Sequence, residues 1–369
     1  MRVVIPVSGN PLSPRPSGIM AFSFGLAGYL KKRGHTVEFL CVGSATPDSA
    51  FQLTPVAARV RGEVGFALAL RKFTRRHTLP ENSIVLANSE LHAWATRRWA
   101  PPAPLVLVSH GPSYPTLAAR RPLIALLFRS IIEPRAARAS RKIIAVDRDA
   151  ERYFRDRYPT IPLQRIPLAI DLAHFAPVDH REARTLWGLS RETAFLFVGR
   201  LAPEKNPERA VEVFRRIRGS LPDAVLIVAG TGPLKGVLDK VAKELGPTRI
   251  RLLNDVPRAD LPSLYSAADG LLVTSDIEQF PTVMLESLAC GTPVFSTDVG
   301  DVSLVLSEPS MGLVCPANPE LFAKRVAEYL PEERRLRASR APLRRQATRK
   351  YDWDAIGPQI EAVLHEANG

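Results

Sequence analysis

The chain has 369 residues, of which 46% are hydrophobic, enough for the cores of two domains of ordinary size. This composition excludes a disordered or fibrous protein. The three cysteines, Cys41, Cys290 and Cys315, lie far apart and form neither a Cys-x-x-Cys pair nor a cluster with histidine. We therefore expect buried thiols rather than a disulfide framework or a zinc site. The chain begins directly with a strand-like segment and shows no signal peptide, which predicts a cytoplasmic protein.

The net charge of +13 is distributed unevenly along the chain. Residues 1–185 contain 27 Lys and Arg against 13 Asp and Glu, a net +14, whereas residues 186–369 contain 23 against 24, a net −1. A basic first half favours an anionic partner such as a membrane surface, a phosphorylated substrate or nucleic acid. Nucleic acid is the weakest of the three, because the basic stretches lack interleaved aromatic residues and match no binding module.

The first half alternates predicted strands with helices. Residues 3–7 and 36–42 predict strands on either side of a helix from about Ile19 to Arg33, which makes a right-handed βαβ unit. The loop before this helix ends in Ser17-Gly18, and such a loop suits a phosphate, although most of them use glycine only for turn geometry. The other elements predicted in this half are a basic helix at 59–77, strands at 83–88, 105–109 and 143–146, and a helix ending near Tyr158.

Two features of the first half suggest binding. His110 directly follows the predicted strand 105–109, and open α/β sheets bind ligands at the carboxyl ends of their strands. A lone histidine is more often structural, but the Gly111 that follows favours a functional role. Residues 120–142 combine a short apolar run with seven cations and are too short in their apolar part to span a bilayer. They predict either a basic amphipathic element on an anionic membrane or a solvated helix face packed on its own sheet.

The second half begins after a predicted linker at 179–191. Strands are predicted at 194–199, 224–229, 250–253, 270–274 and 294–297. Arg200 and Lys205 lie five positions apart on the loop after the first of these strands, a spacing that lets both converge on a diphosphate. The segment 230–236 resembles a dinucleotide fingerprint, but its sixth position is lysine and no suitably placed acid follows, so we reject that interpretation. A terminal amphipathic helix, 351–366, follows a basic run at 334–350.

The stretch Asp276 to Val294 predicts a loop that leads into a helix. Pro281 suits the first helical turn, Gly291 suits the left-handed position after the last turn, and Pro293 prevents continuation. Glu278 and Glu286 then flank a helix N-terminus whose free N–H groups attract anions. This pattern indicates a phosphate-and-sugar site, with an ordinary amphipathic core helix as the alternative.

Five ordered motifs of the second half match a known family. They are Gly199-Arg200-Leu201-x-x-Glu204-Lys205-Asn206, Gly230-x-Gly232-Pro233, Ser263-x-Tyr265-x-x-Ala268-Asp269, Glu278-x-Phe280-Pro281 with Glu286, and Ala289-x-Gly291-x-Pro293. With weaker matches at Ser17-Gly18 and His110-Gly111, the chain resembles the retaining nucleotide-sugar glycosyltransferases of the GT-B fold, family 4-like or group 1. The resemblance implies an α/β fold of two Rossmann-like parallel-sheet domains facing each other across a cleft. An acceptor-binding domain would span 1–180, with the helix 351–369 packing back on it, and a nucleotide-sugar domain would span 186–350.

The resemblance also implies roles for individual residues. Arg200 and Lys205 would neutralise the donor diphosphate as the anomeric bond breaks, and Glu286 would hold the ribose hydroxyls. Glu278 would orient the donor sugar together with backbone groups of Gln279, Phe280, Pro281 and Thr282. The remaining donor contacts would come from His110 to the sugar, Gly18 to the phosphates, and Leu234 and Val256 to the base. No metal and no cofactor other than the donor is implied, and the reaction would retain the anomeric configuration.

The implied activity is sugar transfer from a nucleotide-diphosphate donor to an acceptor hydroxyl, on a lipid-linked or cell-envelope glycan at the inner face of the membrane. The alternatives are a transferase for a small metabolite or natural product, and an inactive protein that only binds sugar nucleotides. Gln279 stands where the family commonly has glycine, which leaves the donor open.

Overall fold

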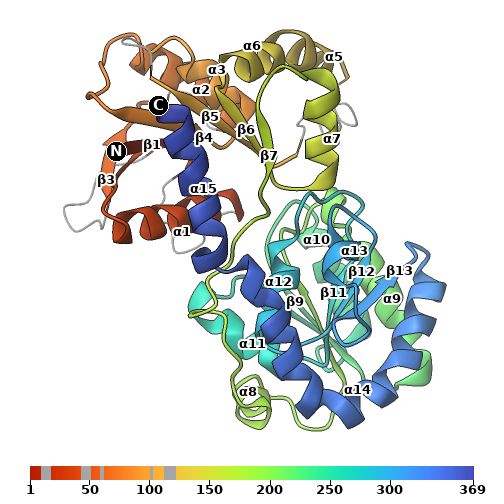
Figure 1. Cartoon of the computed structure of the whole chain (residues 1–369). Helices are drawn as coiled ribbons and strands as arrows, with labels where there is room; N and C mark the ends of the chain where they lie inside the picture. The colour runs from red at the N-terminus through yellow and green to blue at the C-terminus, as the bar shows by residue number, and fades with distance from the viewer. Residues whose placement is uncertain (10–17, 43–50, 59–61, 100–102, 112–121) are drawn as a thin grey trace. The chain divides into compact units, whose positions relative to one another are not determined.

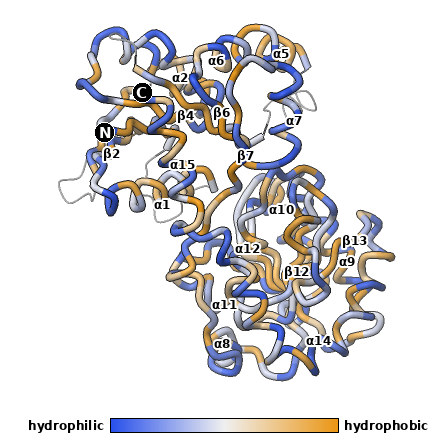
Figure 2. Tube along the Cα trace, in the orientation of Figure 1, coloured by the Kyte–Doolittle hydropathy of each residue, from blue (hydrophilic) through white to orange (hydrophobic). Residues whose placement is uncertain are grey.

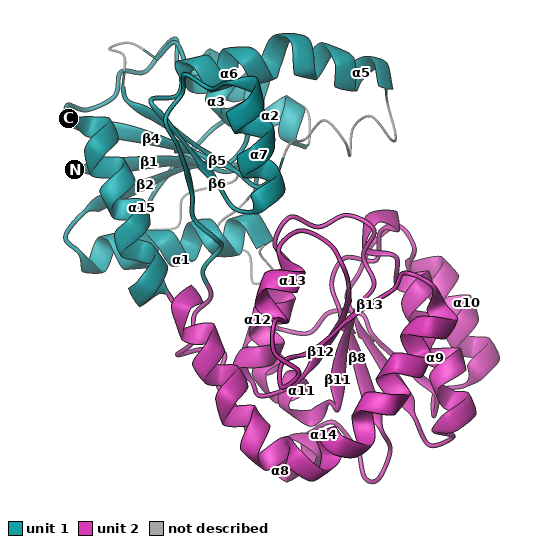
Figure 3. Cartoon of the chain, turned by 45° about the vertical axis from the view of Figure 1, so that its right-hand side comes forward, with its two compact units in different colours: residues 1–169, 353–369 teal, residues 170–352 magenta. Residues whose placement is uncertain are grey.

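The protein is described by a computed structural model that covers residues 1–9, 18–42, 51–58, 62–99, 103–111 and 122–369. It divides into two compact units, residues 1–169 with 353–369 and residues 170–352 (Figures 1 and 3). Each unit is built on one parallel sheet with helices on both of its faces. The predicted fold class, two Rossmann-like α/β domains, is therefore confirmed.

The first unit contains a seven-stranded sheet in the order β3-β2-β1-β4-β5-β6-β7. Its strands are β1 (Arg2–Pro6), β2 (Thr36–Cys41), β3 (Gln52–Pro55), β4 (Ser83–Ala87), β5 (Leu105–Ser109), β6 (Lys142–Ala145) and β7 (Leu163–Arg165). Its helices are α1 (Gly18–Lys32), α2 (Glu63–Phe73), α3 (Glu90–Thr96), α5 (Pro122–Leu127), a π-helix (Phe128–Ile132), α6 (Glu133–Ala139), α7 (Arg148–Arg157) and α15 (Trp353–Asn368). All five strands predicted in this half are present, whereas β3 and β7 were not predicted.

The central strands β4 and β5 are buried along their whole length. They are continuous apolar runs, as is usual for strands of a parallel sheet that is covered on both faces (Figure 2). The terminal helix α15 returns to this unit, as predicted, and packs on α1. Glycine makes the close crossing possible, because a Cβ at Gly357 would overlap the ring of Tyr29 and one at Gly25 would overlap the ring of Trp353. Among the described residues, no helix is both long enough and apolar enough to cross a bilayer.

The second unit contains a six-stranded sheet in the order β10-β9-β8-β11-β12-β13. Its strands are β8 (Ala194–Val198), β9 (Val225–Ala229), β10 (Ile250–Leu253), β11 (Gly270–Val273), β12 (Val294–Thr297) and β13 (Gly312–Cys315). Its helices are α8 (His180–Leu186), α9 (Pro207–Ser220), α10 (Lys235–Leu245), α11 (Leu261–Ala267), α12 (Thr282–Ala289), α13 (Val302–Val305) and α14 (Pro319–Thr348), with 3-10 turns η2 (Pro203–Lys205), η3 (Arg258–Asp260) and η4 (Arg349–Tyr351). The five predicted strands are confirmed, and β13 is additional.

The predicted linker at 179–191 is wrong. This segment contains α8 and belongs to the second unit, which begins at Ile170. Asp179 caps α8 by accepting hydrogen bonds from the backbone N–H groups of Arg181 and Glu182. Arg184 is buried, pairs with Asp269 at 3.3 Å and donates 2.6 Å to the carbonyl of Glu192. Asp179 and Arg184 therefore serve internal contacts, and the segment is part of the second unit rather than a linker.

The basic run 334–350 covers the second half of α14 and the start of η4, and two of its arginines make structural contacts. Arg344 is completely buried, pairs with Glu333 at 2.5 Å and donates 2.9 Å to the carbonyl of Gly291. Arg345 donates 3.2 Å to the carbonyl of Ala289. Both arginines thus supply cations and donors to the C-terminal end of α12, where a helix leaves its carbonyls unpaired and carries negative partial charge.

Candidate active site

Two loops of the second unit meet where the strand order of the sheet reverses. The loop after β8 leads through α9 to β9 on one side of β8, and the loop after β11 leads through α12 to β12 on the other side of β11. Since β8 and β11 are neighbours, their carboxyl ends form a topological switch point. This is the place where open α/β sheets bind ligands, and it carries residues 199–206 and 274–281.

An ion pair between Lys205 and Glu278 joins the two loops. The Glu278 Oε1 atom also accepts a 3.0 Å hydrogen bond from the hydroxyl of Ser275. Glu278 is more deeply buried than Lys205, with 9% of its side chain exposed against 29%. The structure therefore brings together a predicted phosphate ligand and a predicted sugar ligand that lie 73 positions apart in the sequence.

Further contacts hold these loops together. The side chain of Asn206 donates 2.9 Å to Asp276, and the backbone N–H of Asp276 donates 2.9 Å to the carbonyl of Glu204. Asn206 adopts a left-handed conformation with φ 46° and caps α9 by accepting from the N–H of Arg209 at 3.0 Å. Arg209 in turn pairs with Asp276 at 2.6 Å. The backbone around Lys205 is consequently fixed from both sides.

Arg200 is placed differently from Lys205. Its guanidinium pairs with Glu204 four positions later, and 58% of its side chain is exposed. The two predicted diphosphate ligands thus bind separate carboxylates on the same loop system. Their joint action on a diphosphate stays a prediction.

The segment that precedes α12 packs closely against its surroundings. Phe280 is 5% exposed and packs against the ring of Tyr351, so its side chain serves the core and only its backbone is available to a ligand. Gly300 has φ 54°, and a Cβ there would overlap the carbonyl oxygen of Gln279. The helix begins at Thr282 after Pro281, and Gly291 follows its C-terminus with φ 85°, as the sequence predicted.

Glu286 lies in the second turn of α12 and is almost completely buried. Its Oε2 atom accepts a 2.8 Å hydrogen bond from the hydroxyl of Tyr265 on α11. Burial raises the pKa of Glu286, against the opposing influence of the Tyr265 hydroxyl, the Arg258 charge and the Thr282 hydroxyl. The sequence places Tyr265 in a family motif but does not indicate what its side chain does. Its partner could not be named from the sequence because α11 and α12 meet only in the fold.

The loop after β9 explains the glycine pattern 230–236. A Cβ at Gly230 would overlap the carbonyl oxygen of Gly199, and one at Gly232 would overlap that of Leu201. Leu201 donates 2.8 Å to the carbonyl of Thr231 and accepts 2.9 Å from the N–H of Leu234. The glycines thus allow this loop to pack on the loop that carries Arg200 and Lys205. Leu234 and Val256 are half-buried at the carboxyl ends of β9 and β10, and their contact with a base stays a prediction.

His110 sits in the first unit at the end of β5. Its Nε2 atom lies 3.4 Å from the side-chain oxygen of Asn88, and Asn88 donates 2.9 Å to the hydroxyl of Ser23. Burial lowers the pKa of His110 to about 4, so the imidazole is neutral at neutral pH. Gly18 begins α1, and an added Cβ would find no neighbour within 4 Å, so the described residues do not require glycine there. The roles of both residues toward a donor stay predictions.

Two family models match adjacent parts of the chain. The model described as "Glycosyltransferase Family 4" matches residues 16–174, and the one described as "Glycosyl transferases group 1" matches residues 182–350. The chain belongs to this glycosyltransferase family. The two matched regions correspond to the first and second sheets, and the second includes both loops of the switch point.

Curated relatives match over part of their length. A D-inositol 3-phosphate glycosyltransferase of Salinispora tropica is 33% identical over 58% of this chain and 48% of the relative. A GDP-mannose-dependent alpha-(1-6)-phosphatidylinositol monomannoside mannosyltransferase of Mycolicibacterium smegmatis is 26% identical over 62% of this chain and 65% of the relative. The chain spans about half the length of the inositol 3-phosphate glycosyltransferases that it matches.

Solved structures agree over the whole chain. The sucrose-phosphate synthase of Thermosynechococcus elongatus has a TM-score of 0.81 at 20% identity and covers 99% of this chain and 98% of its own. The Anabaena HepE protein, in complex with UDP and glucose, has a TM-score of 0.77 at 16% identity and covers 99% and 100%. At these identities the likeness shows the fold.

Proposed function

We propose that the protein is a glycosyltransferase that moves a sugar from a nucleotide-diphosphate donor to an acceptor hydroxyl. The observation that carries this proposal is the Lys205–Glu278 ion pair at the switch point, with Glu286 in the helix that follows. A cation for phosphate and two carboxylates for hydroxyl groups are the side chains that a sugar nucleotide needs. Family membership and the UDP bound by the HepE protein support the same class of donor.

In the proposed complex, the donor diphosphate replaces Glu278 as the partner of Lys205. Glu278, still held by Ser275, is then free to accept hydrogen bonds from the sugar hydroxyls. Lys205 and Arg200 stabilise the negative charge that develops on the diphosphate when the anomeric bond breaks. Glu286, oriented by Tyr265, accepts from the ribose hydroxyls, and the N-terminus of α12 faces the anion. We propose transfer with retention of configuration, without a metal and without a cofactor beyond the donor.

A donor panel tests this proposal. The thermal unfolding midpoint is measured with UDP-, GDP- and ADP-sugars, since a ligand that binds only the folded state raises it. We expect one base to give a clear increase and Lys205→Ala to lose that increase. The proposed donor class is overturned if no sugar nucleotide raises the unfolding midpoint and the corresponding nucleoside diphosphates do not raise it either.

For the acceptor, we propose a phosphate-bearing molecule at an anionic membrane surface. The two relatives are named for an inositol phosphate and for a phosphatidylinositol monomannoside, respectively. In this chain, α5 and the π-helix expose Leu123, at 81%, and four further apolar side chains, Ile124, Leu126, Leu127 and Ile131. Arg135 and Arg138 are exposed on the adjoining α6. Ala125 and Phe128 are buried, so the helix presents one apolar face inward and another outward.

Vesicle sedimentation tests this surface. We expect the protein to pellet with vesicles that contain anionic phospholipid, and high salt to reduce the pelleted fraction. Replacing Leu123 and Leu127 with serine is expected to abolish pelleting. The control Leu321→Ser, which changes a 51% exposed leucine on α14, should pellet like the wild type. Wild-type protein that stays in solution with anionic vesicles at low salt excludes the membrane surface and leaves a soluble acceptor.

A further inference from the structure

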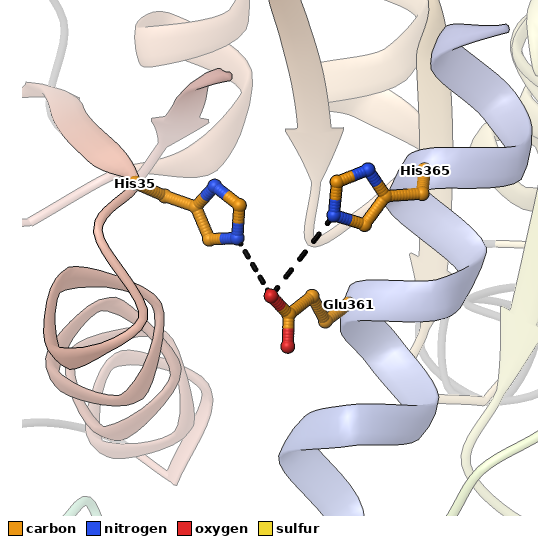
Figure 4. Close-up of side chains that lie close together, drawn as sticks. All are labelled: His35, Glu361 and His365. Atoms are coloured by element: carbon orange, nitrogen blue, oxygen red, sulfur yellow. Dashed lines mark hydrogen bonds and ion pairs between the residues drawn. The ribbon is translucent and has the colours of Figure 1, made fainter.

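We propose that His35, Glu361 and His365 in the first unit form a binding site for one divalent transition-metal ion of the Zn²⁺ class. The three side chains come from the turn between α1 and β2 and from α15, and they converge in Figure 4. None of them belongs to the candidate active site. The proposed ion would take water as its fourth ligand and would join the C-terminal helix to the start of β2.

The ligand atoms have the right chemistry and nearly the right spacing. His35 Nε2 lies 2.8 Å from Glu361 Oε1, His365 Nε2 lies 4.0 Å from the same oxygen, and all three atoms lie within 4.8 Å of one another. In a tetrahedral site with bonds of 2.0–2.1 Å, neighbouring ligand atoms are about 3.3 Å apart. A tetrahedral ion therefore requires two small adjustments, a lengthening of the 2.8 Å His35–Glu361 contact by about 0.5 Å and a shift of the 60% exposed His365 ring toward Glu361 by about 0.7 Å.

The backbone around His35 is fixed. Gly34 follows α1 in the left-handed conformation with φ 85° and donates 3.0 Å to the carbonyl of Lys31. His35 donates 3.0 Å from its N–H to the carbonyl of Leu30. This pair of hydrogen bonds is the Schellman arrangement that ends a helix, so His35 leaves α1 in one defined direction.

The other two ligands are fixed by α15. Glu361 and His365 are four positions apart and therefore lie on the same face of the helix. That face is held against α1 at the Gly357–Tyr29 crossing, where a side chain larger than glycine would overlap the tyrosine ring. Two elements distant in sequence thus present their ligands without rearrangement of the backbone.

The outer oxygen of the carboxylate is already engaged. Glu361 Oε2 accepts from the hydroxyl of Tyr29 at 2.9 Å and from Nε of Arg33 at 3.3 Å. Oε1 is left to face both imidazoles. Hydrogen bonds of this kind orient a ligating carboxylate in metal sites. The positive charge of Arg33 would repel a metal ion, but 61% of its side chain is exposed, so it can move away.

The ring of His365 lies in a T-shaped contact with the ring of His35, with centroids 5.6 Å apart, and takes no part in the hydrogen bonds of Glu361. Its Nε2 atom, 4.0 Å from Glu361 Oε1, lies beyond hydrogen-bond distance, although the ring is directed at that oxygen (Figure 4).

The test uses the full chain after treatment with a chelator. Titration with Co²⁺ is expected to give one saturable site with the intense visible absorption of a four-coordinate ion, and Zn²⁺ should displace it and raise the unfolding midpoint. His365→Ala, which removes an exposed side chain, should fold normally and bind at least about 100-fold more weakly. His77→Ala removes another solvent-accessible imidazole of the first unit and should bind like the wild type. Equal binding by wild type and His365→Ala, or an octahedral Co²⁺ spectrum, overturns the proposal.

Discussion

The hydroxyl of Tyr265 donates a 2.8 Å hydrogen bond to Glu286, and both side chains are buried. This bond joins α11 to the second turn of α12, the helix that follows the loop with Glu278 and Gln279. A buried carboxylate has few ways to reorient once one of its oxygens is engaged. Tyr265 therefore acts as a positioning residue for the group that we assign to the ribose.

Tyr265→Phe keeps the ring and removes only this hydrogen bond. We expect the affinity for the nucleoside diphosphate of the preferred donor to fall about tenfold, the effect of about 1.4 kcal/mol. Inorganic pyrophosphate has no ribose, so its affinity should not change. Calorimetric titration of both ligands measures the two effects. Equal losses for nucleoside diphosphate and pyrophosphate would show that Tyr265 supports the phosphate site instead.

Arg344→Met leaves Glu333 buried without its main partner and removes a donor from the carbonyl of Gly291. We expect the free energy of unfolding to fall by about 3–5 kcal/mol, measured by urea denaturation. Arg335→Ala changes an exposed arginine on the same helix and should stay within about 0.5 kcal/mol of the wild type. Comparable stability of the two variants would contradict the structural role of the basic run.

His92 predicts a dependence of stability on pH. It is buried on α3, and neither ring nitrogen has a hydrogen-bond partner among the described residues. Burial lowers its pKa from 6.5 to about 4. Between these pH values the unfolded chain binds a proton at His92 more readily than the folded protein does. The contribution of neutral His92 to the free energy of unfolding is therefore complete above pH 6.5 and is lost as the pH falls toward 4.

His92→Leu should remove about 3 kcal/mol of the loss in unfolding free energy between pH 7 and pH 4, since each unit of pKa shift corresponds to about 1.4 kcal/mol. The pKa of His110 is also lowered, so the unfolding free energy of the variant should still fall with decreasing pH, but less steeply. His77→Leu, at an exposed position, should keep the wild-type slope. The measurement is urea denaturation at a series of pH values, and identical slopes for wild type and His92→Leu would exclude this assignment.

Most of the fold was predictable because the sheets are parallel and buried. Long apolar runs such as 105–109 and 225–229 identify their strands directly. The missed strands β3, β7 and β13 lie at the edges of their sheets and lack a continuous buried run, so they are defined by pairing with a single neighbour. The helix α14 was not predicted as one element because Pro331 and Pro342 lie inside it.

The residue types of the candidate site were predictable, and their partners were not. Lys205 and Glu278 could be selected because each lies on a strand-to-helix loop, but their ion pair depends on β8 and β11 being neighbours. The burial of Arg184 and Arg344 was missed for a related reason. Arginine is normally exposed, and only the fold supplies the carboxylates and carbonyls that allow these side chains to be buried.

The proposed function depends most on the binding of the donor diphosphate by Lys205. Its most direct test is calorimetric titration of the preferred nucleoside diphosphate into the wild type, Lys205→Ala and Lys324→Ala. Lys324 lies on α14 of the same unit and is exposed, so its replacement removes the same charge away from the switch point. We predict that Lys205→Ala binds at least about tenfold more weakly, the loss of a charge-assisted hydrogen bond worth about 1.5–3 kcal/mol, and that Lys324→Ala binds like the wild type. A folded Lys205→Ala variant with wild-type affinity would contradict the account.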